Sequence, residues 1–239
     1  MSRPLSDHSD PAQPIDIETL LLAYRNGIFP MSDARDDDEV FWVEPRERAI
    51  IPLDGFRCSR SLAKTLRQDR FKVTCNTEFS AVIEHCAAPR DEDGSSWISH
   101  RIQSSYEALH HAGHAHSIEC RQDGQLVGGL YGIGFDQVFC GESMFSRATD
   151  ASKVALAWLV AAMRRAGFRV LDCQFMTGHL RSLGAVCVSQ EEYLTLLYGA
   201  KSAPRHALPD AFAEIYAASS DGSASSPGKL IAQSLTQTS

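Results

Sequence analysis

The spacing of apolar and polar positions divides the chain into predicted helices and strands between residues 17 and 198. Apolar residues three and four apart predict helices, and short runs rich in β-branched and aromatic residues predict strands. The predicted helices cover 17–27, 58–69, 79–87, 102–111, 151–166, 179–183 and 191–198. The predicted strands cover 41–43, 49–53, 71–76, 116–121, 125–133, 137–140 and 169–173. This order predicts an α+β fold with a mixed, twisted sheet that carries helices on both sides.

Local signals strengthen two of these predictions. Asp123-Gly124 stands between two strand-like runs and favours a type I′ hairpin. Asp150 precedes the longest predicted helix and Gly167 follows it, which is typical of a capped helix.

The two ends of the chain lack such patterns. Residues 1–14 are polar and acidic, so we expect a disordered tail there. The pattern fades after Gly199, and residues 219–239 are rich in Ser, Gly and Ala. We therefore expect residues 201–239 to be mostly disordered.

Composition describes an ordinary globular protein. The chain has 239 residues, of which 44% are hydrophobic and 22% charged, so it can bury a substantial core. No run approaches about 18 uninterrupted apolar residues, and the first residues carry no secretory signal. The seven Cys form no Cys-x-x-Cys pair and are expected to be buried, reduced thiols. We expect a cytoplasmic protein.

The net charge of −7 is unevenly distributed. Residues 1–56 hold twelve acids and five bases, which leaves 18 acids and 18 bases for the rest. The overall sign therefore does not exclude a local basic surface. Four bases recur at helical spacing and share one predicted face: Arg57, Arg60, Lys64 and Arg67. This face is either simply solvated or follows a phosphate backbone.

Two polar clusters are candidates for chemistry. Glu142 follows a predicted buried strand, and the adjacent Met144 and Phe145 are too apolar for an ordinary loop, so they favour a pocket. Asp172 and Gln174 alternate at the end of another strand and are expected to face the same side. A ligand amine could bind there, although hydrogen bonds within the protein would also satisfy such groups.

Histidines offer a weaker signal. His114 and His116 alternate on a predicted strand close to His110 and His111, as zinc ligands could. No Cys or carboxylate is placed convincingly as a third ligand. We therefore predict neither a metal site nor a cofactor.

Short motifs at consistent spacing then identify a family. The chain resembles the leucyl/phenylalanyl-tRNA–protein transferases. The similar segments are residues 22–30, Trp42 with Pro45-Arg46, 59–61, Trp97-Ile98, 113–117, 126–129, 140–147, 151–153, 172–174 and 182–185. Each segment is short, but together they are highly specific.

The resemblance implies a fold and a reaction. The fold is a small N-terminal α/β domain, at about 15–58, followed by an N-acetyltransferase-like mixed-sheet domain, at about 59–200. The enzyme moves Leu or Phe, and in some cases Met, from aminoacyl-tRNA to the α-amino group of proteins that begin with Arg or Lys. The product enters the N-degron route of degradation. The implied partners are aminoacyl-tRNA and such proteins or peptides, with no membrane.

The resemblance also implies roles for residues. An aminoacyl ester is already activated, so the enzyme mainly positions an amine and handles one proton. Asp172 polarises Gln174, whose carbonyl oxygen holds the attacking amine, and Glu142 carries charge suited to a cationic N-terminal residue. An apolar pocket receives the donor side chain, with Ser146 in the same substrate-binding set. The pocket residues are Met144, Leu156, Leu159 and Leu171.

The remaining roles concern tRNA. Trp97 and Tyr106 match positions near the terminal adenosine, and Trp42 is assigned to the same donor. The basic face from Arg57 to Arg67 follows the acceptor stem.

Two other functions compete with this one. An acyl-CoA-dependent N-acetyltransferase needs a glycine-rich turn before a helix, but residues 146–150 contain no Gly. A non-catalytic module that binds tRNA or a peptide would explain the basic face equally well. Only Glu142 with Asp172 and Gln174 favours catalysis.

Overall fold

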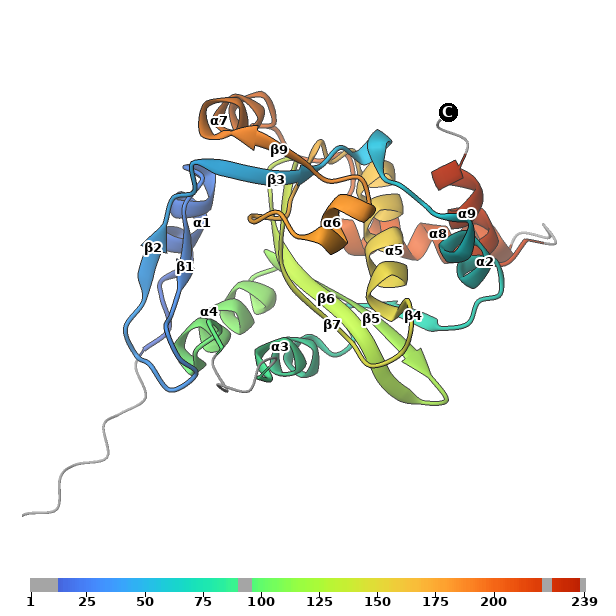
Figure 1. Cartoon of the computed structure of the whole chain (residues 1–239), viewed down its shortest axis with the longest axis horizontal. Coiled ribbons are helices and arrows are strands. Elements are labelled where there is room, and N and C mark those ends of the chain that lie inside the picture. Colours follow the sequence, from blue (N-terminus) through green and yellow to red (C-terminus); the bar gives the residue numbers. More distant parts are fainter. Residues whose placement is uncertain (1–12, 90–95, 221–224, 237–239) are drawn as a thin grey trace, which may run out of the picture.

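The computed structural model describes residues 13–89, 96–220 and 225–236 (Figure 1). The predicted N-terminal tail therefore lies almost entirely outside the described residues. The helices are α1 (Ile17–Arg25), α2 (Arg60–Arg67), α3 (Phe79–Ala87), α4 (His100–His111), α5 (Ala151–Ala166), α6 (Gly178–Ser182), α7 (Gln190–Gly199), α8 (Leu208–Ser220) and α9 (Pro227–Thr236). The strands are β1 (Phe29–Met31), β2 (Phe41–Val43), β3 (Glu47–Ile51), β4 (Lys72–Cys75), β5 (Ala115–Gln122), β6 (Gln125–Phe135), β7 (Val138–Ser146), β8 (Val170–Asp172) and β9 (Val186–Ser189).

One large mixed sheet organises the molecule. Among the described residues, seven strands follow the order β4-β5-β6-β7-β8-β3-β9, and β1 pairs with β2 separately. The β7–β8 pair is parallel, whereas the other neighbours are antiparallel. Consecutive residues of β6 enter opposite cores: Leu130 packs with α5, and Tyr131 packs with α3 and α4. Helices thus cover both faces, and the predicted α+β mixed-sheet class is confirmed.

The N-terminal unit joins this sheet. β3 lies within the predicted small domain 15–58, yet it pairs with β8 on one side and β9 on the other. The division of the chain near residue 58 stays a prediction. Sequence analysis does not predict β1 or β9, which have only 3 and 4 residues.

The hairpin prediction is confirmed in detail. β5 and β6 pair up to Gln122 and Gln125, and the two residues between them are Asp123 and Gly124. Their φ values are 51° and 78°, which is the left-handed geometry of a type I′ turn. Asp and Gly tolerate this backbone better than β-branched residues do.

The longest helix also has the predicted bounds, but one cap differs. α5 ends at Ala166, and the φ of 83° at the following Gly167 suits a left-handed C-cap. The Asp150 side chain makes no cap hydrogen bond. It contacts Lys153 instead, with 3.0 Å between carboxylate and ammonium.

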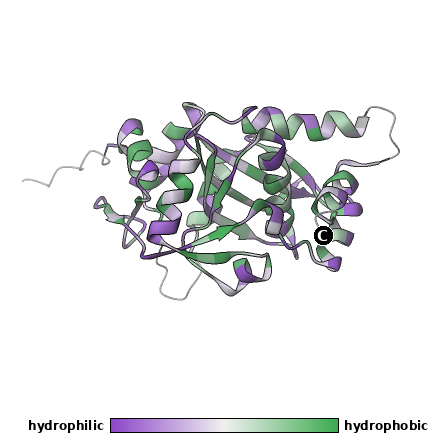
Figure 2. Ribbon diagram, turned by 90° about the horizontal axis from the view of Figure 1, so that it is seen from above, coloured by the Kyte–Doolittle hydropathy of each residue, from purple (hydrophilic) through white to green (hydrophobic). Residues whose placement is uncertain are grey.

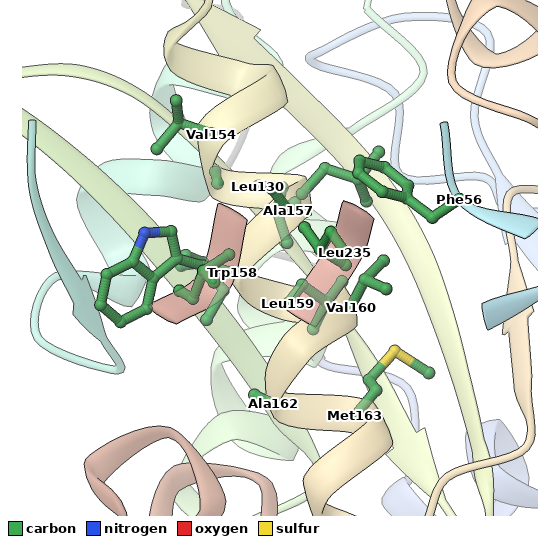
Figure 3. Close-up of a cluster of buried hydrophobic side chains, with 14 of the residues drawn as sticks. Phe56, Leu130, Val154, Ala157, Trp158, Leu159, Val160, Ala162, Met163 and Leu235 are labelled. Atoms are coloured by element: carbon green, nitrogen blue, oxygen red, sulfur yellow. The ribbon is translucent and has the colours of Figure 1, made fainter. Parts of the chain in front are cut away.

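The expected disorder after residue 201 is wrong for two segments. α8 and α9 bury apolar side chains against α5, among them Phe212 and Leu235. The Trp158 ring of α5 is tilted against the rings of Phe212 and Tyr216, each with 5.0 Å between ring centroids. Figure 3 shows Leu235 beside the side chains of α5. In Figure 2, hydrophobic and hydrophilic residues alternate around the outer helices, as expected for helices with one packed face.

Candidate active site

A cavity of about 470 Å³ lies where the N-terminal strand β1 meets the large sheet, α5 and α6. Its lining is largely apolar, and Glu142 is the only carboxylate among the described residues that line it. The lining residues are Phe29, Met31, Trp97, Leu130, Gly141, Glu142, Ser143, Met144, Leu156, Leu159, Leu171, Cys173, Gln174, Phe175, Thr177, His179 and Leu180. Such a cavity is large enough for an amino-acid side chain and part of a nucleotide.

The four apolar residues predicted to form a pocket all line this cavity. Leu156 and Leu159 are three residues apart on α5 and therefore share a helix face. Leu171 comes from β8, which pairs with β7, and Met144 from β7 itself. Ser146 does not line the cavity. Its hydroxyl donates to the Ala148 carbonyl and accepts the Ser152 N–H, so it stabilises the start of α5.

Glu142 lies in a strand and not in a loop after one. β7 continues to Ser146, and its register with β6 changes between Tyr131↔Ser143 and Gly132↔Gly141. Glu142 is the extra residue of this β-bulge, which turns its side chain toward the cavity. The bulge needs glycine opposite it, because a Cβ on Gly132 would lie 2.2 Å from the Cys140 carbonyl oxygen.

Two buried tyrosines support the Glu142 carboxyl group. Tyr106 donates to Glu142 Oε2 over 3.2 Å, and the Tyr24 and Tyr106 hydroxyls lie 2.7 Å apart. Since Tyr106 gives its hydrogen to the carboxylate, Tyr24 donates to Tyr106. Tyr106, which is predicted to lie near the terminal adenosine, is fully buried and is not part of the lining, so its ring is not accessible for stacking on a base.

Burial governs the charge of Glu142. It raises the pKa of Glu142 to about 7, and the Asp172 charge acts in the same direction, while Tyr24, Gln174 and Tyr106 lower it. Its Oε1 has no hydrogen-bond partner among the described residues. The group can therefore change protonation state near neutral pH, which suits a proton acceptor.

Asp172 and Gln174 do not alternate on one strand. β8 ends at Asp172, and Gln174 adopts a left-handed backbone with φ of 60°. The Asp172 carboxylate accepts the Gln174 backbone N–H over 2.8 Å and does not hold its side-chain amide. Gln174 lines the cavity, and its Nε2 has no hydrogen-bond partner among the described residues.

Sequence reasoning does not find the residues behind Asp172. Arg48 of β3 forms a forked ion pair with Asp172, with 2.9 Å between Nη2 and Oδ2. The Tyr193 hydroxyl of α7 donates to the same carboxylate oxygen over 2.8 Å. These partners are 124 and 21 residues away in sequence, and a lone Arg in a short strand gives no signal of the pairing.

Aromatic rings stand at the cavity, but not all of those predicted. Trp97 lines it, whereas Trp42 lies on β2, is 43% exposed and is not among the lining residues. Phe175, which sequence analysis does not select, lines the cavity and remains 49% exposed. Its ring meets the Phe29 ring edge-on with 5.8 Å between centroids.

Comparisons with known proteins find relatives of this chain. A sequence model described as leucyl/phenylalanyl-tRNA protein transferase matches residues 50–198, and the model of the N-terminal domain of the same proteins matches residues 13–46. A leucyl/phenylalanyl-tRNA–protein transferase of Novosphingobium aromaticivorans is 56% identical over 93% of this chain and 96% of its own length. The one of Rhizorhabdus wittichii is 57% identical over 77% of this chain and 74% of its own length.

The chain belongs to the leucyl/phenylalanyl-tRNA–protein transferase family. It is accordingly an aminoacyltransferase. The crystal structure of FemX has a similar fold, with a TM-score of 0.52 and 11% identity over 72% of this chain and 66% of FemX. This likeness shows a shared arrangement of helices and strands and says nothing about the reaction.

The basic residues of this family member lie away from the cavity lining. Arg57, Arg60, Lys64 and Arg67 are all exposed, and the last three share one face of α2. The opposite face buries Leu62 and Leu66, and α2 contacts α9. The basic residues are thus held on a packed helix with their charges in solvent.

Two further findings concern the described part of the chain. It holds no group of three or more His, Cys, Asp or Glu residues arranged to bind a metal ion. None of its helices combines the length and the apolar character that crossing a membrane requires.

Proposed function

We propose that this transferase moves Leu or Phe from aminoacyl-tRNA to the α-amino group of proteins that begin with Arg or Lys. The proposal includes Met as a further donor and the N-degron route as the fate of the product. One observation carries it: an apolar cavity of about 470 Å³ contains a buried carboxyl group and an amide. That combination suits an apolar donor side chain next to a reacting amine.

The donor side chain occupies the apolar end of the cavity. Met144, Leu156, Leu159 and Leu171 surround a Leu or Phe side chain. A pocket of this kind distinguishes substrates by size only modestly, by roughly 1–3 kcal/mol per methylene. The esterified carbonyl then lies toward Glu142 and Gln174.

The chemistry is aminolysis of an ester. The Glu142 carboxylate accepts a proton from the α-ammonium group, and the free amine attacks the ester carbonyl carbon. An N–C bond forms, the bond from that carbon to the ribose 3′ oxygen breaks, and a proton passes to the leaving oxygen. The pKa of Glu142, raised by burial to about 7, suits this exchange near neutral pH. The Gln174 carbonyl oxygen accepts a hydrogen bond from the attacking amine.

Binding of the tRNA uses other surfaces. Trp97 at the cavity and the exposed Trp42 contact the terminal adenosine, where stacking contributes roughly 1–3 kcal/mol. The exposed cations of α2 and Arg57 follow the phosphates of the acceptor stem.

An acyl-CoA-dependent acetyltransferase is the less favoured alternative. Such enzymes bind pyrophosphate with backbone N–H groups of a glycine-rich turn before a helix. The turn before α5 contains no Gly, and Asp150 places a carboxylate at that helix end. A non-catalytic binding module would leave the buried Glu142 and its tyrosine partners without a use.

The test is a transfer assay with purified protein. Charged Phe-tRNA and a peptide beginning with Arg are incubated with the chain, and the Phe-Arg product is detected by mass. The matched control peptide begins with citrulline, which has a similar shape without the charge. Transfer to the Arg peptide alone supports the proposal. Binding of charged tRNA without any transfer supports the binding module, and acetylation by acetyl-CoA supports the alternative enzyme.

A further inference from the structure

Arg48 is a fully buried cation directly behind the cavity. It is 1% exposed, and its guanidinium contacts both Asp172 oxygens, with 3.2 Å from Nε to Oδ1 and 2.9 Å from Nη2 to Oδ2. An arginine that contacts both oxygens of a carboxylate fixes the orientation of the carboxylate as well as its distance. Burying two charges is costly, so the pair by itself is weak evidence for a role in stability.

Two aromatic rings hold the guanidinium. Its central carbon lies 4.8 Å from the ring centroid of Phe29 and 4.5 Å from that of Tyr193. Phe29 belongs to β1 and Tyr193 to α7, so the contacts of Arg48 join β3 to both of these elements. The Tyr193 hydroxyl also donates to Asp172 Oδ2 over 2.8 Å. The position of Arg48 is therefore set by rings as well as by charge.

This cluster leads to the cavity by two routes. Asp172 is 0% exposed and cannot meet a substrate without rearrangement, but its Oδ1 accepts the backbone N–H of Gln174 over 2.8 Å. This bond helps to hold the left-handed backbone of Gln174, which costs energy in a residue other than glycine. In the second route, Phe29 supports the ring of Phe175, which also lines the cavity.

We propose that Arg48 is a positioning residue of the transfer reaction: it fixes the Asp172 carboxylate, which in turn fixes Gln174 at the cavity wall. This inference rests on the proposed function. Asp172 then acts on the backbone of Gln174 from behind, and its negative charge is matched by Arg48. Lysine cannot replace this arginine, because an ammonium group cannot bind both Asp172 oxygens in the same planar geometry and cannot stack on both rings.

Arg48→Lys is the direct test because it keeps the positive charge and removes the double contact with the Asp172 carboxylate. We expect kcat for Phe transfer to fall between about tenfold and 100-fold, since small errors of position have such effects. The KM values for Phe-tRNA and for the Arg peptide should stay unchanged, because Arg48 touches neither substrate. Tyr193→Phe keeps the ring and removes one bond to Asp172, so it should lower kcat in the same way but by less.

Arg25→Lys is the matched control. Arg25 also pairs with an acid, Asp136, and lies over a ring, Phe135, but none of these residues lines the cavity. Its replacement should leave both kcat and KM unchanged. Comparing melting temperatures of the variants separates loss of folded protein from loss of rate.

The decisive readout is the combination with Gln174→Ala. If Arg48 acts through Gln174, Arg48→Lys should lower kcat no further once that amide is absent. A purely structural arginine would give additive losses. Should Arg48→Lys fail to fold, Tyr193→Phe is measured in the wild-type protein and in Gln174→Ala. A loss of kcat in the wild-type protein alone then supports the inference, and additive losses contradict it.

Other outcomes overturn the inference. Wild-type kcat in Arg48→Lys or, where that variant does not fold, in Tyr193→Phe contradicts it, as does a rise in KM at unchanged kcat. Wild-type protein is run in every assay: if it does not transfer Phe at all, the proposed function fails, whereas transfer by wild type and variants alike defeats only the role of Arg48.

Discussion

The surroundings of Trp158 and the surroundings of Glu142 are equally buried but differ in chemistry. Around Trp158, α5, α8 and α9 bury apolar side chains and aromatic rings (Figure 3). Around Glu142 and Arg48, the molecule buries a carboxyl group with one unpartnered oxygen and a guanidinium with one unpartnered nitrogen, counting partners among the described residues. The first region lowers the free energy of the fold through apolar burial. The second raises it, because polar groups are buried there without a full set of hydrogen bonds.

α5 belongs to both regions. Leu156 and Leu159 line the cavity, whereas Trp158 meets the rings of Phe212 and Tyr216 from α8. One helix thus connects a stabilising cluster to the wall of the cavity. The comparison predicts that substitutions near Trp158 change stability and those near Glu142 change rate.

The largest expected effect is on stability. Trp158→Ala should lower the free energy of unfolding by about 3–5 kcal/mol, as removal of a buried aromatic side chain does. Denaturant unfolding measures this, and Trp158→Phe, which keeps a ring, should lose much less. At a temperature where Trp158→Ala remains folded, its kcat should match wild type. A fall in kcat of the folded variant would show that the packing around Trp158 also affects the rate.

The largest expected effect on rate comes from the cavity. Gln174→Ala should lower kcat by about 100-fold, because it removes a hydrogen bond to the attacking amine in the transition state. Binding of Phe-tRNA should stay unchanged, and single-turnover kinetics separate the two. Phe transfer at the wild-type rate under saturating peptide would mean that Gln174 has only a structural role.

A smaller effect concerns the choice of donor. Leu156→Trp should shrink the apolar end of the cavity and weaken Phe transfer relative to Leu transfer by roughly 1–3 kcal/mol in kcat/KM. Leu156→Met, which nearly conserves volume, is the control and should leave the ratio unchanged. Equal losses for both donors would show that Leu156 does not contact the donor side chain.

The smallest expected effect concerns the protein surface, outside the surroundings of both Trp158 and Glu142. Replacing Arg57, Arg60, Lys64 and Arg67 with Glu should reduce the slope of log affinity for charged tRNA against log salt by roughly 0.7–0.9 for each phosphate that the protein no longer neutralises. Lys201→Glu serves as a control, since Lys201 follows α7, which lies far from α2 (Figure 1). An unchanged slope in the fourfold variant would remove α2 from the proposed tRNA-binding surface.

Local signals account for what the sequence predicts well. The Asp123-Gly124 turn and the bounds of α5 depend on residues next to one another, and both are confirmed. The helix α8 could have been predicted by the same reasoning, because Leu208, Ala211, Phe212 and Ile215 recur at helical spacing and are buried. The Ser- and Gly-rich residues that follow it favoured the wrong prediction of disorder.

The site is only partly predictable for a different reason. Apolar lining residues follow from pattern and resemblance, and the structure brings all four together. The bulge at Glu142 depends on how β6 and β7 pair, and the Tyr106 hydroxyl contacts that of Tyr24, which lies 82 residues away. The Arg48–Asp172 pair spans 124 residues. Such long-range contacts leave no periodic signal in a single sequence.

Glu142→Gln should raise stability and lower activity together, because a neutral amide replaces a buried carboxylate that accepts a proton. The folded state raises the pKa of Glu142 to about 7, so it holds the proton more tightly than the unfolded chain. Its contribution to stability is therefore present at low pH and is lost as pH rises through about 7. At pH 8 the variant should unfold with a higher free energy than wild type, by up to roughly 3 kcal/mol. The two proteins should differ little at pH 5.

The same preparation is assayed for Phe transfer to the Arg peptide. We expect the variant to lose kcat, and wild-type kcat to fall as pH drops below about 7 because the carboxylate becomes protonated. The free energy of unfolding at pH 8 and the single-turnover rate of transfer are measured on the same preparation and compared. Gained stability with lost transfer supports the role of Glu142 as a buried proton acceptor. A variant that transfers Phe at the wild-type rate, or that is less stable than wild type at pH 8, would contradict it.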